Sequence, residues 1–174
     1  EVYQKKILDN PNTGEQKYRY LIPLLKEFEL PDEAFVEMEQ YANKKGIIFL
    51  VNPWDKKSAD VIESLLNVPI YKIGSPDFTN NELLEYVAKY GKDMILSTGM
   101  SKEEEISKGV EFMKGLGVKF ALMHCNNSYP APFDEINLRF MDRLKDFGVP
   151  VGYSGHERGV AVAIAAVARG ASII

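Results

Sequence analysis

The stretch MILSTGMSKEEEISKGVEFMKGLGVKFALM, residues 94–123, holds one complete unit of the pattern that decides the fold. It starts with the apolar run Met94–Leu96, continues through an amphipathic helical pattern over Ser101–Leu116, stops at Gly117 and enters a second apolar run at Phe120–Met123. Both runs have the length of buried strands and lack polar alternation, which is typical of parallel strands covered on both faces. The stretch therefore predicts two parallel strands joined by a helix.

The same unit recurs along the chain. Other apolar runs are Ile47–Val51, Ile70–Ile73 and Val149–Tyr153, with a weaker one at Val2–Gln4 and the start of another at Ser172–Ile174. The helical patterns between them are Asp32–Lys45, Lys57–Leu66, Asn80–Tyr90, Phe133–Phe147 and Gly159–Ala168. Roughly seven strands in this order predict an α/β fold, and we expect a (β/α)8 TIM barrel, present as a partial barrel of about strands 2 to 8. An open doubly wound sheet is the alternative, but no GxGxxG turn supports it.

Residues at the ends of the helical patterns predict where the helices begin and end. Ser101, with Glu104 three residues later, has the spacing of a capping box. Four glycines follow helical patterns where a left-handed residue commonly ends a helix: Gly46, Gly91, Gly117 and Gly148. These signals place short loops between each helix and the next strand, as expected for a β-α-β order.

The composition excludes several classes of function. The chain has 174 residues, of which 45% are hydrophobic and 26% are charged, so it can bury a core as one domain. A net charge of -4 argues against a nucleic-acid partner, and no apolar run reaches the roughly 18 residues that a membrane span needs. The single cysteine, Cys125, excludes an internal disulfide and fits a cytoplasmic protein.

Polar side chains gather where the predicted strands end, which is where (β/α)8 barrels place their chemistry. Successive strand ends carry hydroxyls, amides, one lysine and one histidine, namely Asn52; Lys72, Ser75 and Asp77; Ser97; Asn127 and Tyr129; Ser154 and His156. Many hydrogen-bonding groups around a single positive charge suit a bound phosphate or carboxylate. The sequence therefore predicts an anion site at this end of the sheet.

These residues also have structural interpretations. Lys72 lies in an apolar strand, where an inward lysine is costly unless it has a partner, so we favour a functional role over an exposed edge position. Ser75 and Ser97 each fit a turn, and Asp77 fits a helix cap. For His124, which follows a buried run, we favour a core histidine.

Four motifs occur in a definite order, YKIGS at 71–75, ILSTGM at 95–100, HCNNSYP at 124–130 and GYSGH at 152–156. Together they resemble the motifs of the N-acetylneuraminate (sialic acid) synthase family. That family includes legionaminate and pseudaminate synthases and relatives in spore-coat polysaccharide biosynthesis. The resemblance covers nearly the whole chain, and four motifs in the right strand phase are far more specific than any one of them.

The resemblance implies a function. Family members are homodimers that condense phosphoenolpyruvate with an N-acetylmannosamine-like sugar to give a nonulosonic acid and phosphate, with a divalent metal, Mn²⁺ or else Mg²⁺. By motif match, Asp77, Lys72 and Tyr129 are the candidate catalytic residues, and His156 is a candidate metal ligand. The candidate substrate contacts are Gln4, Asn52, Lys72, Ser75, Ser97, Asn127, Tyr129 and Ser154.

The chain departs from the family pattern at several positions. Pro76 stands where the family has glycine, Gly155 where an aspartate precedes the metal histidine, and Val2 where a lysine is usual. The first strand–helix unit, a second metal histidine and a C-terminal antifreeze-like domain are expected to lie outside this chain. Because a metal site needs three or four ligands, His156 alone cannot complete one, and we expect the chain to be inactive by itself.

Two other functions stay open. The chain could belong to another enzyme on the same barrel, such as a 3-deoxy-sugar-phosphate synthase or an aldolase, in which Lys72 would be the candidate for a Schiff base. It could also be a sugar-binding barrel without catalysis, a hypothesis motivated by Val2, Pro76 and Gly155.

Overall fold

The computed structural model describes residues 26–174, and the chain divides into two compact units, Glu1–Met38 and Glu39–Ile174. Helix α3 (Asp32–Lys44) begins in the first unit with two acidic residues, which suit the positive end of a helix dipole. The weak strand expected at Val2–Gln4, and with it the candidate residue Gln4, lies outside the described residues.

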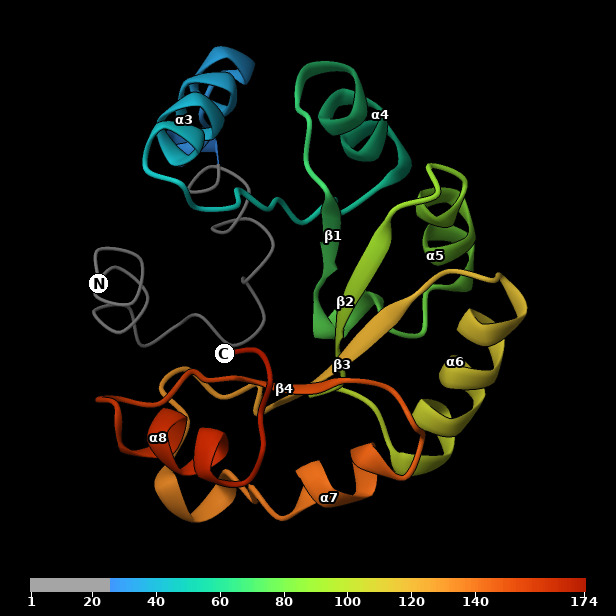
Figure 1. Cartoon of the computed structure of the whole chain (residues 1–174), viewed down its shortest axis with the longest axis vertical. Coiled ribbons are helices and arrows are strands. Elements are labelled where there is room, and N and C mark those ends of the chain that lie inside the picture. Colours follow the sequence, from blue (N-terminus) through green and yellow to red (C-terminus); the bar gives the residue numbers. More distant parts are fainter. Residues whose placement is uncertain (1–25) are drawn as a thin grey trace, which may run out of the picture. The chain divides into compact units, whose positions relative to one another are not determined.

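A parallel four-stranded sheet is the centre of the second unit (Figure 1). Its strands follow the order of the sequence and are β1 (Ile70–Ile73), β2 (Asp93–Ser97), β3 (Phe120–Cys125) and β4 (Val151–Ser154). Every neighbouring pair of strands is parallel. Between one strand and the next, the chain therefore crosses back through a helical connection to the end of the sheet where the strands begin. The predicted α/β fold with parallel strands is confirmed.

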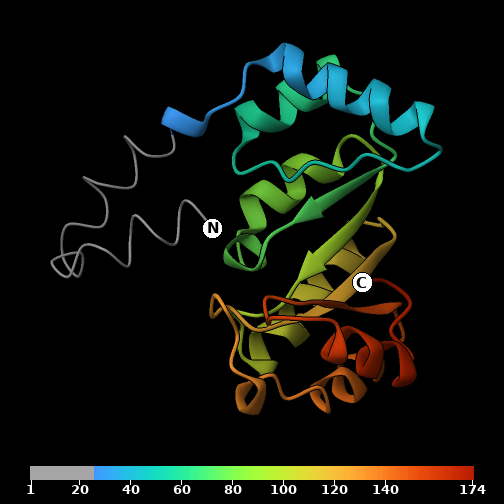
Figure 2. The same cartoon turned by 90° about the vertical axis from the view of Figure 1, so that its left-hand side faces the viewer.

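Helices lie along one side of this sheet, and the view in Figure 2 shows the strands fanning as a twisted sheet does. The helices are α4 (Lys56–Leu65), α5 (Asn81–Ala88), α6 (Glu103–Gly115), α7 (Phe140–Lys145) and α8 (Ala161–Ala168), with the 3-10 turns η1 (Ser75–Asp77) and η2 (Phe133–Glu135). The four glycines expected to end helices, Gly46, Gly91, Gly117 and Gly148, have φ values of 70°, 69°, 73° and 71°. Within residues 26–174, no helix has the length and apolarity that crossing a membrane requires.

Side chains along each strand alternate between the two faces of the sheet, so one face packs against the helices and the other carries polar groups. On the face toward the helices, the side chains of Tyr71, Leu96, Leu122 and Tyr153 are each no more than 1% exposed. The inner face carries Lys72, Ser97, Cys125 and Ser154. Because parallel strands end at one edge, these polar residues meet at the carboxyl ends of the strands.

The prediction of a strand at Ile47–Val51 was wrong. No described strand pairs with this segment, and Ile47 and Ile48 are 61% and 67% exposed. An apolar run becomes a strand only where a neighbouring strand supplies its backbone hydrogen bonds. At the other end, residues 172–174 do pair with β4, because Ser172 N donates to Val151 O and Tyr153 N donates to Ile173 O, both at 2.9 Å.

Two helix boundaries also differ from expectation. The helix expected over Phe133–Phe147 is divided into η2 and α7, because Asn137 between them has a φ of 48°, which no right-handed helix tolerates. The capping carboxylate of α6 comes from Glu105, whose Oε2 accepts from Lys102 N at 2.7 Å, so the predicted capping box was one residue too early. Ser101 Oγ is buried, and no described residue bonds to it.

Two glycines of α6 provide a matched test of this packing. A Cβ at Gly109 would lie 2.6 Å from Phe78 Cε1, whereas one at Gly115 would meet nothing within 4 Å. Gly115→Ala should raise the free energy of unfolding by up to about 1 kcal/mol through helix propensity. Gly109→Ala should lower it by about 1–3 kcal/mol, because the overpacked ring of Phe78 is fully buried. Urea unfolding measures both, and equal effects would contradict the packing described.

Candidate active site

The central feature of the inner face is an ammonium group bound to a hydroxyl. Lys72 Nζ donates to Ser97 Oγ at the end of β2 and to the carbonyl of Ile73, 3.2 Å away. Ser97 is only 3% exposed and Lys72 is half-buried, so the pair is partly withdrawn from water. Burial lowers the pKa of Lys72 because the charged form loses hydration, and the nearby Cys125 acts in the opposite direction. A bound anion would give this charge the partner that no described carboxylate supplies.

The loops that follow the strands are bonded to one another. Gly99 N, after β2, donates to Ser75 Oγ, after β1, at 3.1 Å. Both the amide and the hydroxyl of Thr98 donate to Met123 O in β3, each at 3.1 Å. With its amide nitrogen turned toward β1, Asn52 donates to Lys72 O at 2.7 Å. Asn52, Ser75 and Ser97 are therefore brought to the same edge as Lys72.

A second cluster joins the loops after β3 and β4. Tyr129 and His156 stack with ring centroids 3.8 Å apart, and the Tyr129 hydroxyl lies 2.7 Å from His156 Nε2. His156 Nδ1 lies 2.5 Å from the carbonyl oxygen of Asn126, which can only accept, so this hydrogen bond needs a proton on Nδ1. In that tautomer of the neutral ring, the Nε2 lone pair faces the Tyr129 hydroxyl. Partial burial raises the pKa of the Tyr129 phenol, which keeps it a donor to that lone pair.

Cys125 lies between these two clusters, and sequence reasoning missed it as a site residue. Cys125 is 6% exposed, its Sγ lies 3.9 Å from His156 Nδ1, and its proximity raises the pKa of Lys72. The alternation of side chains between the two faces of a strand would have identified it. Cys125 is two residues beyond Met123, which is paired with Ser97, so all three share the inner face.

Other candidates from the sequence do not join the clusters. Asp77 accepts from Asn80 Nδ2 at 3.1 Å, while Asn80 itself caps α5 through Leu83 N, so Asp77 supports a cap rather than forming one. Asn127 is exposed, and Ser154 lies at the end of β4, paired in register with Cys125.

The interpretation of His124 as a core histidine is supported by its surroundings. It is 7% exposed, lies between the rings of Phe140 and Tyr153, and bonds through Nε2 to Ile136 O at 2.6 Å. Burial lowers its pKa, since the charged imidazolium would lose its hydration.

The fit to a divalent metal is partial. His156 has one feature of a metal-binding histidine, a ring nitrogen fixed by a backbone carbonyl, while its other ring nitrogen lies 2.7 Å from the Tyr129 hydroxyl. Within the part of the chain that the structure describes, no group of three or more His, Cys, Asp or Glu side chains could hold a metal ion. This chain therefore offers one ligand of such a site.

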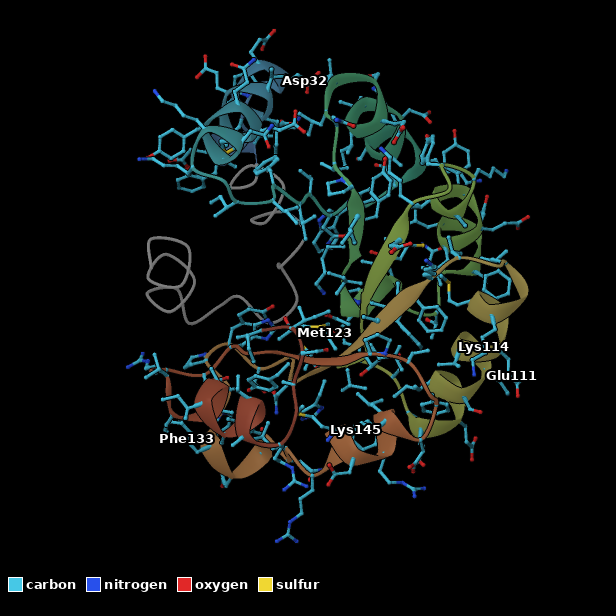
Figure 3. The ribbon with its side chains drawn as sticks, in the orientation of Figure 1. Asp32, Glu111, Lys114, Met123, Phe133 and Lys145 are labelled. Carbon is cyan, nitrogen blue, oxygen red and sulfur yellow. The ribbon has the colours of Figure 1, made fainter. Side chains whose placement is uncertain are left out.

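A separate hollow of about 500 Å³ lies at the opposite, amino ends of the strands. Its lining is mostly apolar and includes Ile70, Ile95, Ala121 and Pro150, with Lys114 and Lys119 at its margin. Lys114 Nζ is already bonded to Phe147 O at 3.1 Å, and Figure 3 shows Lys114 on the outer helix layer, away from Met123. The polar groups of the candidate site do not line this hollow, so we place the chemistry at the carboxyl ends.

Comparison with known proteins gives consistent matches. A family model described as the NeuB family matches residues 2–174. The N,N'-diacetyllegionaminic acid synthase of Campylobacter jejuni is 41% identical over 157 residues, which are 88% of this chain and 47% of that protein. The N-acetylneuraminate-9-phosphate synthase of Homo sapiens is 31% identical over 175 residues, 99% of this chain and 48% of that protein.

Solved structures agree with these matches. The sialic acid synthetase of Leptospira borgpetersenii, crystallised with citrate, has a TM-score of 0.85 and 35% identity, covering 92% of this chain and 56% of that chain. The chain spans about half the length of the curated relatives it matches.

The surroundings of Lys72 should lower the pH at which its ammonium group loses a proton. Reductive ¹³C-methylation followed by an NMR pH titration resolves single lysines, and the resonance missing in Lys72→Arg identifies this one. We expect its midpoint below about 10.4, the unperturbed lysine value. Inorganic phosphate should raise the midpoint, because an adjacent anion favours the protonated form. A titration midpoint that equals the unperturbed lysine value and does not change with phosphate would contradict the partial burial of the Lys72 ammonium group.

Proposed function

Because the chain belongs to the NeuB family, we propose that it is part of a synthase that condenses phosphoenolpyruvate with an N-acetylmannosamine-like sugar. The products are a nonulosonic acid, of use in polysaccharide biosynthesis, and phosphate. The observation that carries the proposal is the half-buried ammonium of Lys72 on Ser97, at the edge where the strand ends meet. In this proposal the sheet is part of a TIM barrel of about strands 2 to 8, and the complete protein is a cytoplasmic homodimer.

The reaction forms one carbon–carbon bond and consumes one water. The enol carbon of phosphoenolpyruvate attacks the aldehyde of the open-chain sugar, water adds to the neighbouring carbon, and phosphate leaves as its C–O bond breaks. Lys72 and Ser97 would bind an anionic group of phosphoenolpyruvate, with Asn52, Ser75, Asn127 and Ser154 as further contacts. Preorganised donors of this kind stabilise the charge that develops on oxygen in the transition state.

The second cluster would serve the sugar. His156 Nε2 is the atom available to a divalent metal, Mn²⁺ or Mg²⁺, whose chemistry when bound would be polarisation of the aldehyde oxygen. Tyr129 would exchange its bond to Nε2 for one to the substrate. Asp77, proposed for proton transfer, would have to leave Asn80 to reach the reacting atoms.

A second candidate function is a Schiff-base aldolase. It is favoured by one observation: burial lowers the pKa of Lys72, which increases the neutral amine that such a reaction needs. Borohydride reduction in the presence of pyruvate would trap a covalent adduct on Lys72 in that case. The proposed synthase predicts no adduct.

The synthase proposal is tested by assaying phosphate release from phosphoenolpyruvate by the full-length protein. Release should require Mn²⁺ or Mg²⁺ and an N-acyl mannosamine-type sugar. Lys72→Met should lower kcat/KM by about 100-fold or more, because an anchoring donor of the anion is lost. Lys57→Met, which removes an exposed lysine of α4, is the matched control and should have no effect.

Absence of phosphate release with every such sugar would refute the synthase proposal. Equal losses in the Lys72 and Lys57 variants would refute the assignment of the anion site to Lys72.

A further inference from the structure

The Glu157 side chain is hydrogen-bonded to a core residue of the sheet. Its Oε2 accepts from the Tyr153 hydroxyl at 2.6 Å. Tyr153 faces the helix layer from β4, is 1% exposed, and packs beside His124 with ring centroids 5.9 Å apart. Burial, and then the neighbouring carboxylate, raise the pKa of Tyr153, so its phenol remains a donor. The Glu157 carboxylate is therefore anchored to a rigid, fully packed side chain.

Gly155 makes this contact possible. A Cβ at residue 155 would lie 2.7 Å and 2.8 Å from the two carboxylate oxygens of Glu157 and 2.8 Å from Tyr153 Cε1. Gly155 is not among the glycines with positive φ, so the lack of a side chain, not backbone freedom, is what the structure requires. The Glu157 carboxylate occupies the space of the missing side chain. An acidic group thus occupies the side-chain position of the residue before His156, although that residue is glycine.

The segment held by this contact carries two candidate site residues. Ser154 and His156 flank Gly155, and the contact between Tyr153 and Glu157 spans all three. The main-chain oxygen of His156 also accepts from Ala131 N at 3.1 Å, which ties the segment to the loop that carries Tyr129. A shift of Glu157 would therefore move His156 and, through it, that loop.

We propose that Glu157 is a positioning residue, whose carboxylate, held over Gly155 by the Tyr153 hydroxyl, sets the places of Ser154 and His156. The inference rests on the proposed function, since it takes those two residues as ligand contacts. In this proposal Glu157 acts through Ser154 and His156 and does not itself bind substrate or metal. Its effect is of the kind seen for groups that orient metal ligands from behind, whose loss typically costs about 10–100-fold in affinity.

The test compares variants at 157 and 155 in the full-length protein, with phosphoenolpyruvate alone and Mn²⁺ alone as calorimetric probes. Glu157→Leu should weaken binding of both probes by about 10–100-fold. Glu157→Gln keeps an acceptor oxygen for Tyr153 and should bind both within about 3-fold of the unaltered protein. Gly155→Ala should resemble Glu157→Leu, because its Cβ displaces the carboxylate, and the double variant should be no weaker than either single variant.

The chain offers a matched control for simple loss of packing. Tyr71 in β1 is 0% exposed and donates to Glu63 of α4 at 2.6 Å, a similar hydrogen bond without a site residue enclosed in a turn. Glu63 also pairs with Lys92 at 2.6 Å, so Glu63→Leu should lower stability at least as much as Glu157→Leu does, yet leave both dissociation constants unchanged. Equal weakening of binding by Glu63→Leu, or none by Glu157→Leu, would overturn the inference.

Failure of the inference and failure of the proposed function are distinguishable. Phosphate release by the unaltered protein reports on the function. The ¹H–¹⁵N signals of the His156 ring report on the position of that ring alone, and they should shift in Glu157→Leu but not in Glu157→Gln. Unshifted signals in Glu157→Leu would overturn the inference whether or not the protein is a synthase.

Discussion

The positive charge of Lys72 inside a parallel sheet is the constraint on which the rest of the site depends. An ammonium group withdrawn from water is unfavourable unless hydrogen-bond acceptors or a negative charge lie beside it. Here Ser97 Oγ and the Ile73 carbonyl accept from it, and its own carbonyl is bonded by Asn52. These groups satisfy hydrogen bonds but do not neutralise the charge. In the proposed function, a bound anion would supply the negative charge that these groups lack.

The surrounding loops keep this charge in place by bonding to each other rather than to solvent. Ser75 bonds to Gly99, Thr98 to Met123, and His156 to Asn126, so each strand end is tied to the next. Such ties restrict the motions that would misplace donors by an ångström, an error that costs large factors in rate. The hydrogen bond between Tyr153 and Glu157 fixes the turn after β4 to that strand.

The parallel strands and the edge that carries the polar residues could be predicted from the sequence, because buried runs and helix-ending glycines are local signals. Pairing is not local, so the apolar run at Ile47–Val51 was taken for a strand although no described strand pairs with it. Hydrophobic periodicity alone predicted one continuous helix, which the positive φ of Asn137 divides in two. Gly155 looked like a lost acidic group. The position of the Glu157 carboxylate over Gly155 depends on a contact with Tyr153 across the turn, which residue order does not reveal.

The most direct test of the central claim is a crystal structure of the full-length protein with phosphoenolpyruvate. The account predicts a phosphate or carboxylate oxygen about 2.7–2.9 Å from Lys72 Nζ, at the carboxyl ends of the strands beside Ser97. Phosphoenolpyruvate bound instead in the hollow at the amino ends, against Ile70 and Lys119, with Lys72 still bonded only to Ser97 and Ile73, would contradict it.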